Sequence, residues 1–253
     1  MAVYCSADWH GNYWVWEQVK EILKPDDKLF FLGDANDRGP DGWKIIKEIL
    51  KDGRIIYIKG NHEKFIVDAL GRLKPEDFKP DNLDWIWNRK FDIWFYNGGR
   101  TTYENIIEDN ISPEEKIKII NKLNELPFCV VYHNGCGDDI LLSHAGCDNF
   151  EAGNIADEDT LLWDRNHCMF YDTWWGNDTE IIVHGHTPIP YLYQEHWDNY
   201  KTFKKYESLE PNYDGGAYWY GKGHKVDIDM GTIFTNQAVL LNLQNWEETI
   251  LSI

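Results

Sequence analysis

The most constraining feature of this 253-residue sequence is the stretch from Phe30 to Gly39, which reads FFLGDANDRG. Its apolar beginning predicts a buried strand, and its glycines allow a tight turn where that strand ends. Because of this turn, the side chains of Asp34, Asp37 and Arg38 leave the sheet together. In α/β folds the carboxyl ends of strands are where ligands bind. The stretch therefore predicts a strand-end site with carboxylates for metal ions and a guanidinium for phosphoryl oxygens.

The rest of the sequence predicts an α/β fold around this strand. Expected strands cover residues 2–5, 28–32, 54–58, 128–133, 139–143 and 180–183, and two more lie within 225–242. Stretches with apolar residues at helical spacing separate the first three strands, and residues 63–126 read mainly as helix. Such alternation of strands and helices is typical of a parallel sheet with covering helices. We expect a single domain over residues 1–253.

Five short motifs each follow an expected strand and carry Asp, Asn or His. They are Asp8-x-His10, Gly33-Asp34-x-x-Asp37-Arg38-Gly39, Gly60-Asn61-His62-Glu63, Ser143-His144-Ala145-Gly146 and Gly185-His186-Thr187. Mixed imidazole and oxygen ligands suit borderline divalent ions such as Mn, Fe, Zn or Ni. The potential ligands are too many for one tetrahedral site with a water, and they suit two ions about 3.5–4 Å apart.

This set of motifs resembles the binuclear metallophosphatase (calcineurin-like phosphoesterase) superfamily. More narrowly, Asp37-Arg38-Gly39 and the Asn61-His62-Glu63 triplet resemble its phosphoprotein phosphatase branch, in the compact form found in bacteria and phages. The resemblance implies a two-sheet αββα sandwich of the metallophosphatase type, with helices outside. The sequence departs from the usual pattern at Ala7, where the family has Gly, and at Asn36, where it often has Val.

The resemblance also implies a role for each motif residue. The implied metal ligands are Asp8 and His10 for the first ion, Asp34 as the bridge, and Asn61, His144 and His186 for the second. Arg38 and Arg165 would bind phosphoryl oxygens, with Asn61 also close to the substrate. His62 would donate a proton to the leaving oxygen, and Asp37 would orient His62. The two divalent ions would be manganese first, with iron, zinc or nickel as alternatives.

The function predicted from these roles is hydrolysis of phosphomonoesters by direct attack of a metal-bridging hydroxide. A Ser/Thr protein phosphatase is the preferred interpretation, with a phosphoprotein or a small phosphoester as substrate. A symmetrical dinucleoside tetraphosphate hydrolase uses nearly the same motifs and stays open as an alternative. A metal-bound binding module without activity is the third hypothesis, although binding alone would not need an acid such as His62.

The charge and the cysteine content limit the partners and the cellular compartment that we expect for this protein. The net charge is −18 and the sequence pI is about 4.8, which argues against nucleic acid as a partner because such binding needs clustered Lys and Arg. No apolar run is long enough for a membrane helix, and no secretory signal is visible. The five cysteines lack a CxxC spacing, which favours free thiols in a reducing cytoplasm. Oligomeric state is open.

A segment rich in aromatic residues follows the last motif. Residues 190–223 show little helical or strand periodicity, so we expect an irregular insertion at the rim of the site, acting as a packed flap or in substrate recognition. Three residues near motifs receive structural roles in this interpretation. These are Arg100 after a glycine pair, His184 beside a ligand, and Asp229 before a glycine turn.

Overall fold

The computed structural model describes residues 1–78, 89–147, 156–169, 174, 176–203 and 213–253. Its strands form two mixed five-stranded sheets, as the α/β prediction required. The first sheet has the order β10-β9-β1-β2-β3 and the second the order β4-β5-β6-β8-β7. The strands of the first sheet are β1 Val3–Ser6, β2 Lys28–Phe31, β3 Ile55–Tyr57, β9 Gln237–Asn242 and β10 Glu248–Ser252. Those of the second are β4 Cys129–His133, β5 Asp139–Ser143, β6 Glu180–His184, β7 Tyr218–Tyr220 and β8 Lys225–Asp227.

The two sheets pack face to face, and alternation along each strand creates three apolar layers. Cys5 and Phe30 of the first sheet join Leu142 and Val183 of the second in the layer between the sheets. Their neighbours along the strands point outward, as Phe31 does on the first sheet and Ile182 on the second. Because successive side chains of a strand point to opposite faces, both faces of each sheet are buried.

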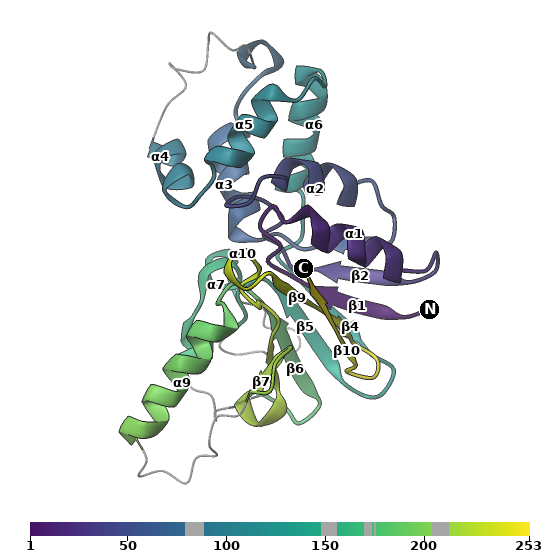
Figure 1. Ribbon diagram of the computed structural model, residues 1–253, viewed down its shortest axis with the longest axis vertical. Coiled ribbons are helices and arrows are strands. Elements are labelled where there is room, and N and C mark those ends of the chain that lie inside the picture. Colours follow the sequence, from purple (N-terminus) through teal and green to yellow (C-terminus); the bar gives the residue numbers. More distant parts are fainter. Residues whose placement is uncertain (79–88, 148–155, 170–173, 175, 204–212) are drawn as a thin grey trace.

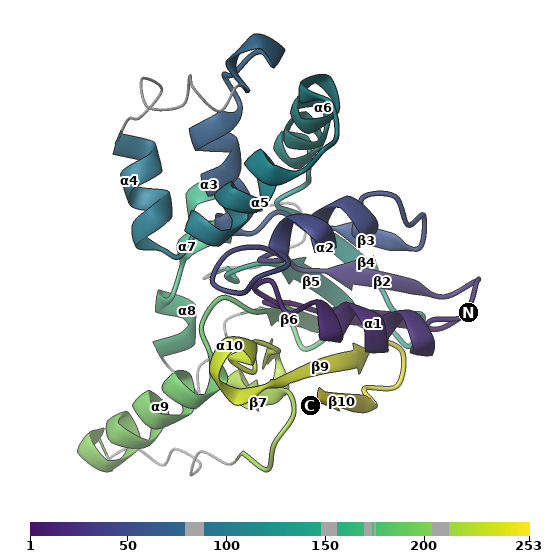
Figure 2. The ribbon, with the colours of Figure 1, turned by 45° about the horizontal axis from the view of Figure 1, so that its top comes forward.

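Helices cover the outer faces of this sandwich (Figures 1 and 2). Against the first sheet pack α1 Tyr13–Ile22 and α2 Gly42–Ile49, and α3 Asn61–Leu70, α4 Arg89–Tyr96, α5 Arg100–Glu108 and α6 Pro113–Asn124 gather at one end. The short helices are η1 Pro75–Asp77, α7 Glu158–Trp163, α8 Asn166–Met169, η3 Gly221–Gly223 and α10 Thr232–Thr235. The arrangement confirms the predicted two-sheet fold with outer helices.

The prediction of an irregular segment over residues 190–223 was wrong for the beginning of that segment. Ile189–Phe203 forms the 15-residue helix α9. Ile189, Leu192 and His196 are buried at a spacing of three and four residues, which is the helical period. Pro190 lies in the first turn, where a missing N–H costs no helical hydrogen bond. Residues 204–212 of the expected insertion lie outside the described residues.

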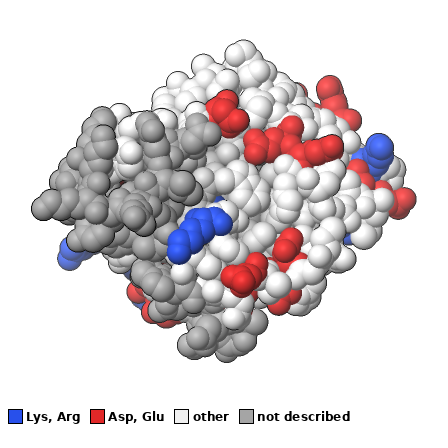
Figure 3. Space-filling view, turned by 90° about the horizontal axis from the view of Figure 1, so that it is seen from below, with Lys and Arg blue, Asp and Glu red and all other residues white. Residues whose placement is uncertain are grey.

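Two surface features bear on the expected partners. On the face seen from below, acidic side chains are spread over the described surface and basic ones are few, which fits the acidic composition (Figure 3). Among the described helices, none combines the length and the apolar character needed to span a bilayer.

Candidate metal centre

The motifs meet at one edge of the sandwich because the strands that precede them are parallel. Strands β1, β2 and β3 run parallel in the first sheet, and β5, β6 and β8 run parallel in the second. Their carboxyl ends therefore lie at the same edge of each sheet, as expected for an α/β site. The sheets are joined at this edge by His144, whose Nδ1–H donates to the carbonyl of Leu32, 2.8 Å away.

The backbone at this edge is held in an unusual conformation. Six of the nine non-glycine residues with positive φ among the described residues belong to the predicted site, namely Asp8, His10, Asp34, Asp37, Arg38 and His186. Such conformations cost free energy and cluster at functional sites. Close packing adds to the constraint, since a Cβ on Gly60 would lie 2.2 Å from Asp34 Oδ1 and one on Gly185 2.0 Å from Asp8 Oδ2.

Asp34 stands at the centre, and its two oxygens face different groups. Oδ2 lies 3.6 Å from His10 Nε2, whereas Oδ1 lies 3.5 Å from His144 Nε2. Two groups of potential metal ligands share this residue: His10, Asp34 and His62, and Asp8, Asp34 and His144. Burial alone would raise the pKa of Asp34, but the neighbouring imidazoles of His144, His62 and His10 lower it, which keeps the carboxylate charged. This is the geometry expected of a bridging ligand.

On one side of Asp34, ring nitrogens of His144 and His186 converge on the amide oxygen of Asn61. His144 is buried, which lowers its pKa, and its Nδ1–H is used by Leu32, so Nε2 carries a lone pair. That nitrogen lies 2.8 Å from Oδ1 of Asn61, which is also an acceptor. His186 Nδ1 is 3.1 Å from the same oxygen and 3.2 Å from His144 Nε2. Two acceptors this close repel one another unless a cation lies between them, so this donor set fits a divalent ion.

Asp8 brings a second carboxylate to Asp34, and one of its oxygens has no hydrogen-bond partner among the described residues. Asp8 is 1% exposed and this oxygen is Oδ1, while Oδ2 accepts from the backbone N–H of His186 at 3.1 Å. His10 Nδ1–H donates to the carbonyl of Asn36, which turns Nε2 toward the site, 3.9 Å from Asp8 Oδ1. Burial, followed by the charges of Asp229 and Asp34, raises the pKa of Asp8. A cation here would offset the repulsion between the carboxylate of Asp8 and those of Asp34 and Asp229, so these residues also fit a metal ion.

Glu63 fixes the position of the Asp34 backbone. Its carboxylate accepts hydrogen bonds from the N–H groups of Asp34, Ala35 and Gly60 at 2.8, 2.9 and 2.8 Å, and from the hydroxyl of Tyr57 at 2.7 Å. Burial and the charge of Asp34 raise the pKa of Glu63 to about 7. Glu63 thus holds the backbone of Asp34 and Gly60 in position.

His62 and Asp37 form a buried pair beside the ligand groups. His62 Nδ1–H donates to Asp37 Oδ2 at 2.7 Å, and the same oxygen accepts from Trp94 Nε1–H at 2.8 Å. Burial acts to lower the pKa of His62, but Asp34 and Asp37 outweigh it and the pKa is raised. Since Nδ1 is held by Asp37, the ring directs Nε2 toward the metal centre, 3.8 Å from Asp34 Oδ2. A protonated Nε2 could reach a leaving oxygen from there.

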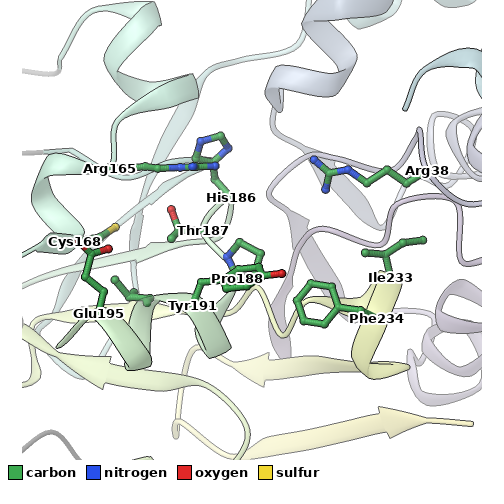
Figure 4. A pocket seen from close by; sticks show the side chains of 11 residues that line it. Arg38, Arg165, Cys168, His186, Thr187, Pro188, Tyr191, Glu195, Ile233 and Phe234 are labelled. Carbon is green, nitrogen blue, oxygen red and sulfur yellow. The ribbon is translucent and has the colours of Figure 1, made fainter. Parts of the chain in front are cut away.

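Two arginines approach the centre from opposite sides (Figure 4). Arg38 contacts His10 Nε2, and its Nη2 lies 3.0 Å from His62 Nε2. Arg165, between α7 and α8, lines a pocket together with Arg38 and His186. The side chain of Arg100 is 67% exposed, pairs with Glu104 at the surface and is not among the residues that line this pocket.

His184 lies behind the site. It is fully buried, its Nε2 is 2.6 Å from the hydroxyl of Tyr220, and its Nδ1–H donates to the carbonyl of Gly185 at 3.0 Å. Its ring packs against His167, and together with Cys168 these two histidines form a third buried cluster of potential ligands. His184 therefore supports the end of β6, two residues before His186, in keeping with the structural role expected for it.

Asp229 was interpreted as a turn residue, but it also belongs to the site. Its Oδ1 accepts from the backbone N–H of Gly231 at 2.8 Å, as a turn residue would. However, it is 2% exposed, it acts on the pKa of Asp8, and burial together with Asp34 raises its own pKa to about 7. Sequence reasoning could have found it, because Asp229 follows β8 just as the predicted ligands follow their strands.

Comparison with known proteins supports this fold. A family model described as calcineurin-like phosphoesterase matches residues 1–225. The chain therefore belongs to the calcineurin-like phosphoesterase family. The buried Asp and His clusters are those expected of the binuclear site typical of this family.

Individual proteins that match this chain share only a small part of its sequence. The asymmetrical bis(5'-nucleosyl)-tetraphosphatase PrpE of Halalkalibacterium halodurans is 26% identical over 188 residues, which are 65% of this chain and 65% of that protein. The symmetrical bis(5'-nucleosyl)-tetraphosphatase of Buchnera aphidicola is 26% identical over 191 residues, 72% of this chain and 59% of that protein. The matches span less than two-thirds of either relative. A protein serine/threonine phosphatase from Saccharomyces cerevisiae shares the fold with a TM-score of 0.51 and 14% identity, covering 100% of this chain and 80% of that one.

Proposed function

We propose that this protein hydrolyses dinucleoside polyphosphates with two divalent ions held on either side of Asp34. The observation that carries the proposed chemistry is the sharing of Asp34 between two buried ligand groups, with arginines at opposite sides of the adjoining pocket. Two divalent ions bound there would lower the pKa of a water and draw charge from phosphoryl oxygens. Manganese is the first ion to test, with iron, zinc and nickel as alternatives.

The side chains around the ligands have separate tasks in this proposal. Asp8 and His10 would hold the first ion, and Asn61, His144 and His186 the second. Arg38 and Arg165 would bind phosphoryl oxygens, because a guanidinium offers paired N–H donors in a planar fork. Positioning and charge stabilisation of this kind account for most of the catalysis of phosphoryl transfer.

The leaving oxygen would be protonated by His62. Asp37 holds the His62 ring so that Nε2 faces the centre, and Trp94 in turn holds Asp37. A proton would pass from Nε2 to the leaving oxygen as its bond to phosphorus breaks.

The choice of substrate rests on the sequence relatives. Both relatives described above are named as bis(5'-nucleosyl)-tetraphosphatases, which supports the alternative considered from sequence over the Ser/Thr protein phosphatase. A second candidate remains hydrolysis of phosphoserine or phosphothreonine esters. The buried Asp37–His62 pair favours it, because an alkoxide leaving group needs an acid more than a nucleotide does.

A substrate panel separates these functions. With manganese-loaded protein, we expect kcat/KM on diadenosine tetraphosphate to exceed that on a phosphoserine peptide by at least about tenfold, a difference of about 1.4 kcal/mol in transition-state binding. Chromatography of the products would show ADP alone for symmetrical cleavage, or ATP and AMP for asymmetrical cleavage. The Asp34→Asn protein, purified in parallel, controls for contaminating phosphatases.

The opposite ranking, with the phosphopeptide preferred, would replace the proposed function by the protein phosphatase. Turnover of neither substrate by protein that demonstrably contains two metal ions would favour the binding module.

A further inference from the structure

A pocket of about 470 Å³ opens beside the metal centre, and its walls differ from end to end (Figure 4). Arg38, Arg165 and His186 form the end nearest the ligands. The other end is lined by apolar and aromatic side chains from α9 and α10. Its volume is within the usual range for small-molecule pockets. The roles proposed for the metal ligands and arginines account for the first end but leave the second without a function.

Two exposed aromatic rings form the far wall. Tyr191 is 65% exposed and Phe234 is 49% exposed, and their ring centroids lie 5.6 Å apart with planes at 52°. Large apolar side chains that stay exposed beside an active site are often there for a ligand. The ring of Phe234 lies over Gly231, where a Cβ would come within 2.3 Å of it. The two rings thus form one continuous aromatic surface.

Polar groups are arranged along the pocket in a definite order. The two arginines lie on either side of the end nearest the metal centre, whereas Glu195, one helical turn after Tyr191, brings a carboxylate to the pocket. That negative charge disfavours a phosphate at its own position and can accept hydrogen bonds from hydroxyl or amino groups. Thr187 Oγ1 is buried in the same lining and has no hydrogen-bond partner among the described residues. A donor or acceptor on a ligand would satisfy it.

We propose that this pocket binds the nucleoside next to the phosphate being attacked. The inference rests on the proposed function and names the part of the substrate that this chain recognises. A nucleotide matches the order of groups, since its phosphates would meet the arginines, its ribose hydroxyls Thr187 and Glu195, and its base the rings of Tyr191 and Phe234. Stacking on aromatic side chains tolerates any base, so the pocket would select nucleotides without strict base specificity.

Kinetics of the Tyr191→Ala protein test this proposal. We expect KM for diadenosine tetraphosphate to rise about tenfold, in line with the loss of one base stacking contact. The inhibition constant of inorganic phosphate should stay within about twofold, because phosphate needs only the metal centre and the arginines. Tyr191→Phe keeps the ring and should keep the wild-type KM. Tyr96→Ala is the matched control, since Tyr96 is 92% exposed and does not line the pocket.

The outcomes separate the two proposals. If the wild-type protein does not hydrolyse the dinucleotide, the proposed function fails and this inference fails with it. If it does, but Tyr191→Ala leaves KM unchanged or weakens phosphate inhibition equally, the nucleoside pocket is wrong while the proposed function stands. A rise in KM confined to a phosphoserine peptide would assign the aromatic wall to a peptide and overturn the nucleoside.

Discussion

Replacing Asp34 by Asn is expected to remove at least one metal ion per chain and to lower kcat by more than about 100-fold. The neutral amide keeps the shape of the side chain but loses the charge that both ligand groups share. Changing groups that merely orient metal ligands typically costs about 10–100-fold, so loss of the shared ligand should cost more. Metal content by mass spectrometry, measured beside kcat on diadenosine tetraphosphate, tests both parts.

A matched variant separates this effect from a general loss of charge. Asp68→Asn removes a carboxylate from α3 that pairs with Lys64 at the surface, and it should leave metal content and kcat unchanged. Two ions per chain together with wild-type turnover in Asp34→Asn would show that Asp34 bridges nothing.

Replacing His62 by Asn should slow the hydrolysis of poor leaving groups by roughly 10²–10⁴-fold. The loss should be large for a phosphoserine peptide, whose alkoxide must be protonated as it leaves. It should be much smaller for p-nitrophenyl phosphate, whose leaving oxygen is stable without a proton. Rates of the variant and the wild type on both substrates, at saturating concentration, measure the difference.

The companion variant Asp37→Asn should show the same dependence on leaving group with a smaller loss, because His62 keeps its ring but loses its orientation. Equal losses on both substrates in the His62 variant would mean that His62 binds substrate or metal and does not act as the acid.

The centre of this site could be predicted from sequence because of how its strands are arranged. Each motif follows a short apolar strand, and the parallel pairing of β1, β2 and β3, and of β5 and β6, places all strand ends at one edge. A residue that follows such a strand must therefore lie at this edge. For this reason local sequence patterns were enough to predict that five residues lie together, namely Asp8, Asp34, Asn61, His144 and His186. Their roles as ligands stay predictions.

Two other elements, α9 and β10, were not predicted because their sequence patterns are weaker. In α9, the many aromatic residues mask the helical spacing of the buried residues Ile189, Leu192 and His196. The pattern is also weak because His196 is a polar residue at a core position. Strand β10 was missed because it lies at the edge of its sheet, and Leu251 is the one buried residue in it. Edge strands of this kind lack the apolar alternation by which strands are recognised.

The aromatic pocket could not be predicted from local sequence. Tyr191 and Phe234 are 43 positions apart and meet through the packing of α9 and α10 beside the second sheet. Their contact depends on tertiary structure, which the spacing of neighbouring residues does not express.

Anomalous diffraction from crystals grown with Mn²⁺ tests the central claim most directly. We predict two peaks about 3.5–4 Å apart on either side of the Asp34 carboxylate. One should lie beside Asp8 and His10, and the other beside Asn61 and His144. A single peak at the site, or manganese bound only at the cluster of His167, Cys168 and His184, would contradict the binuclear centre.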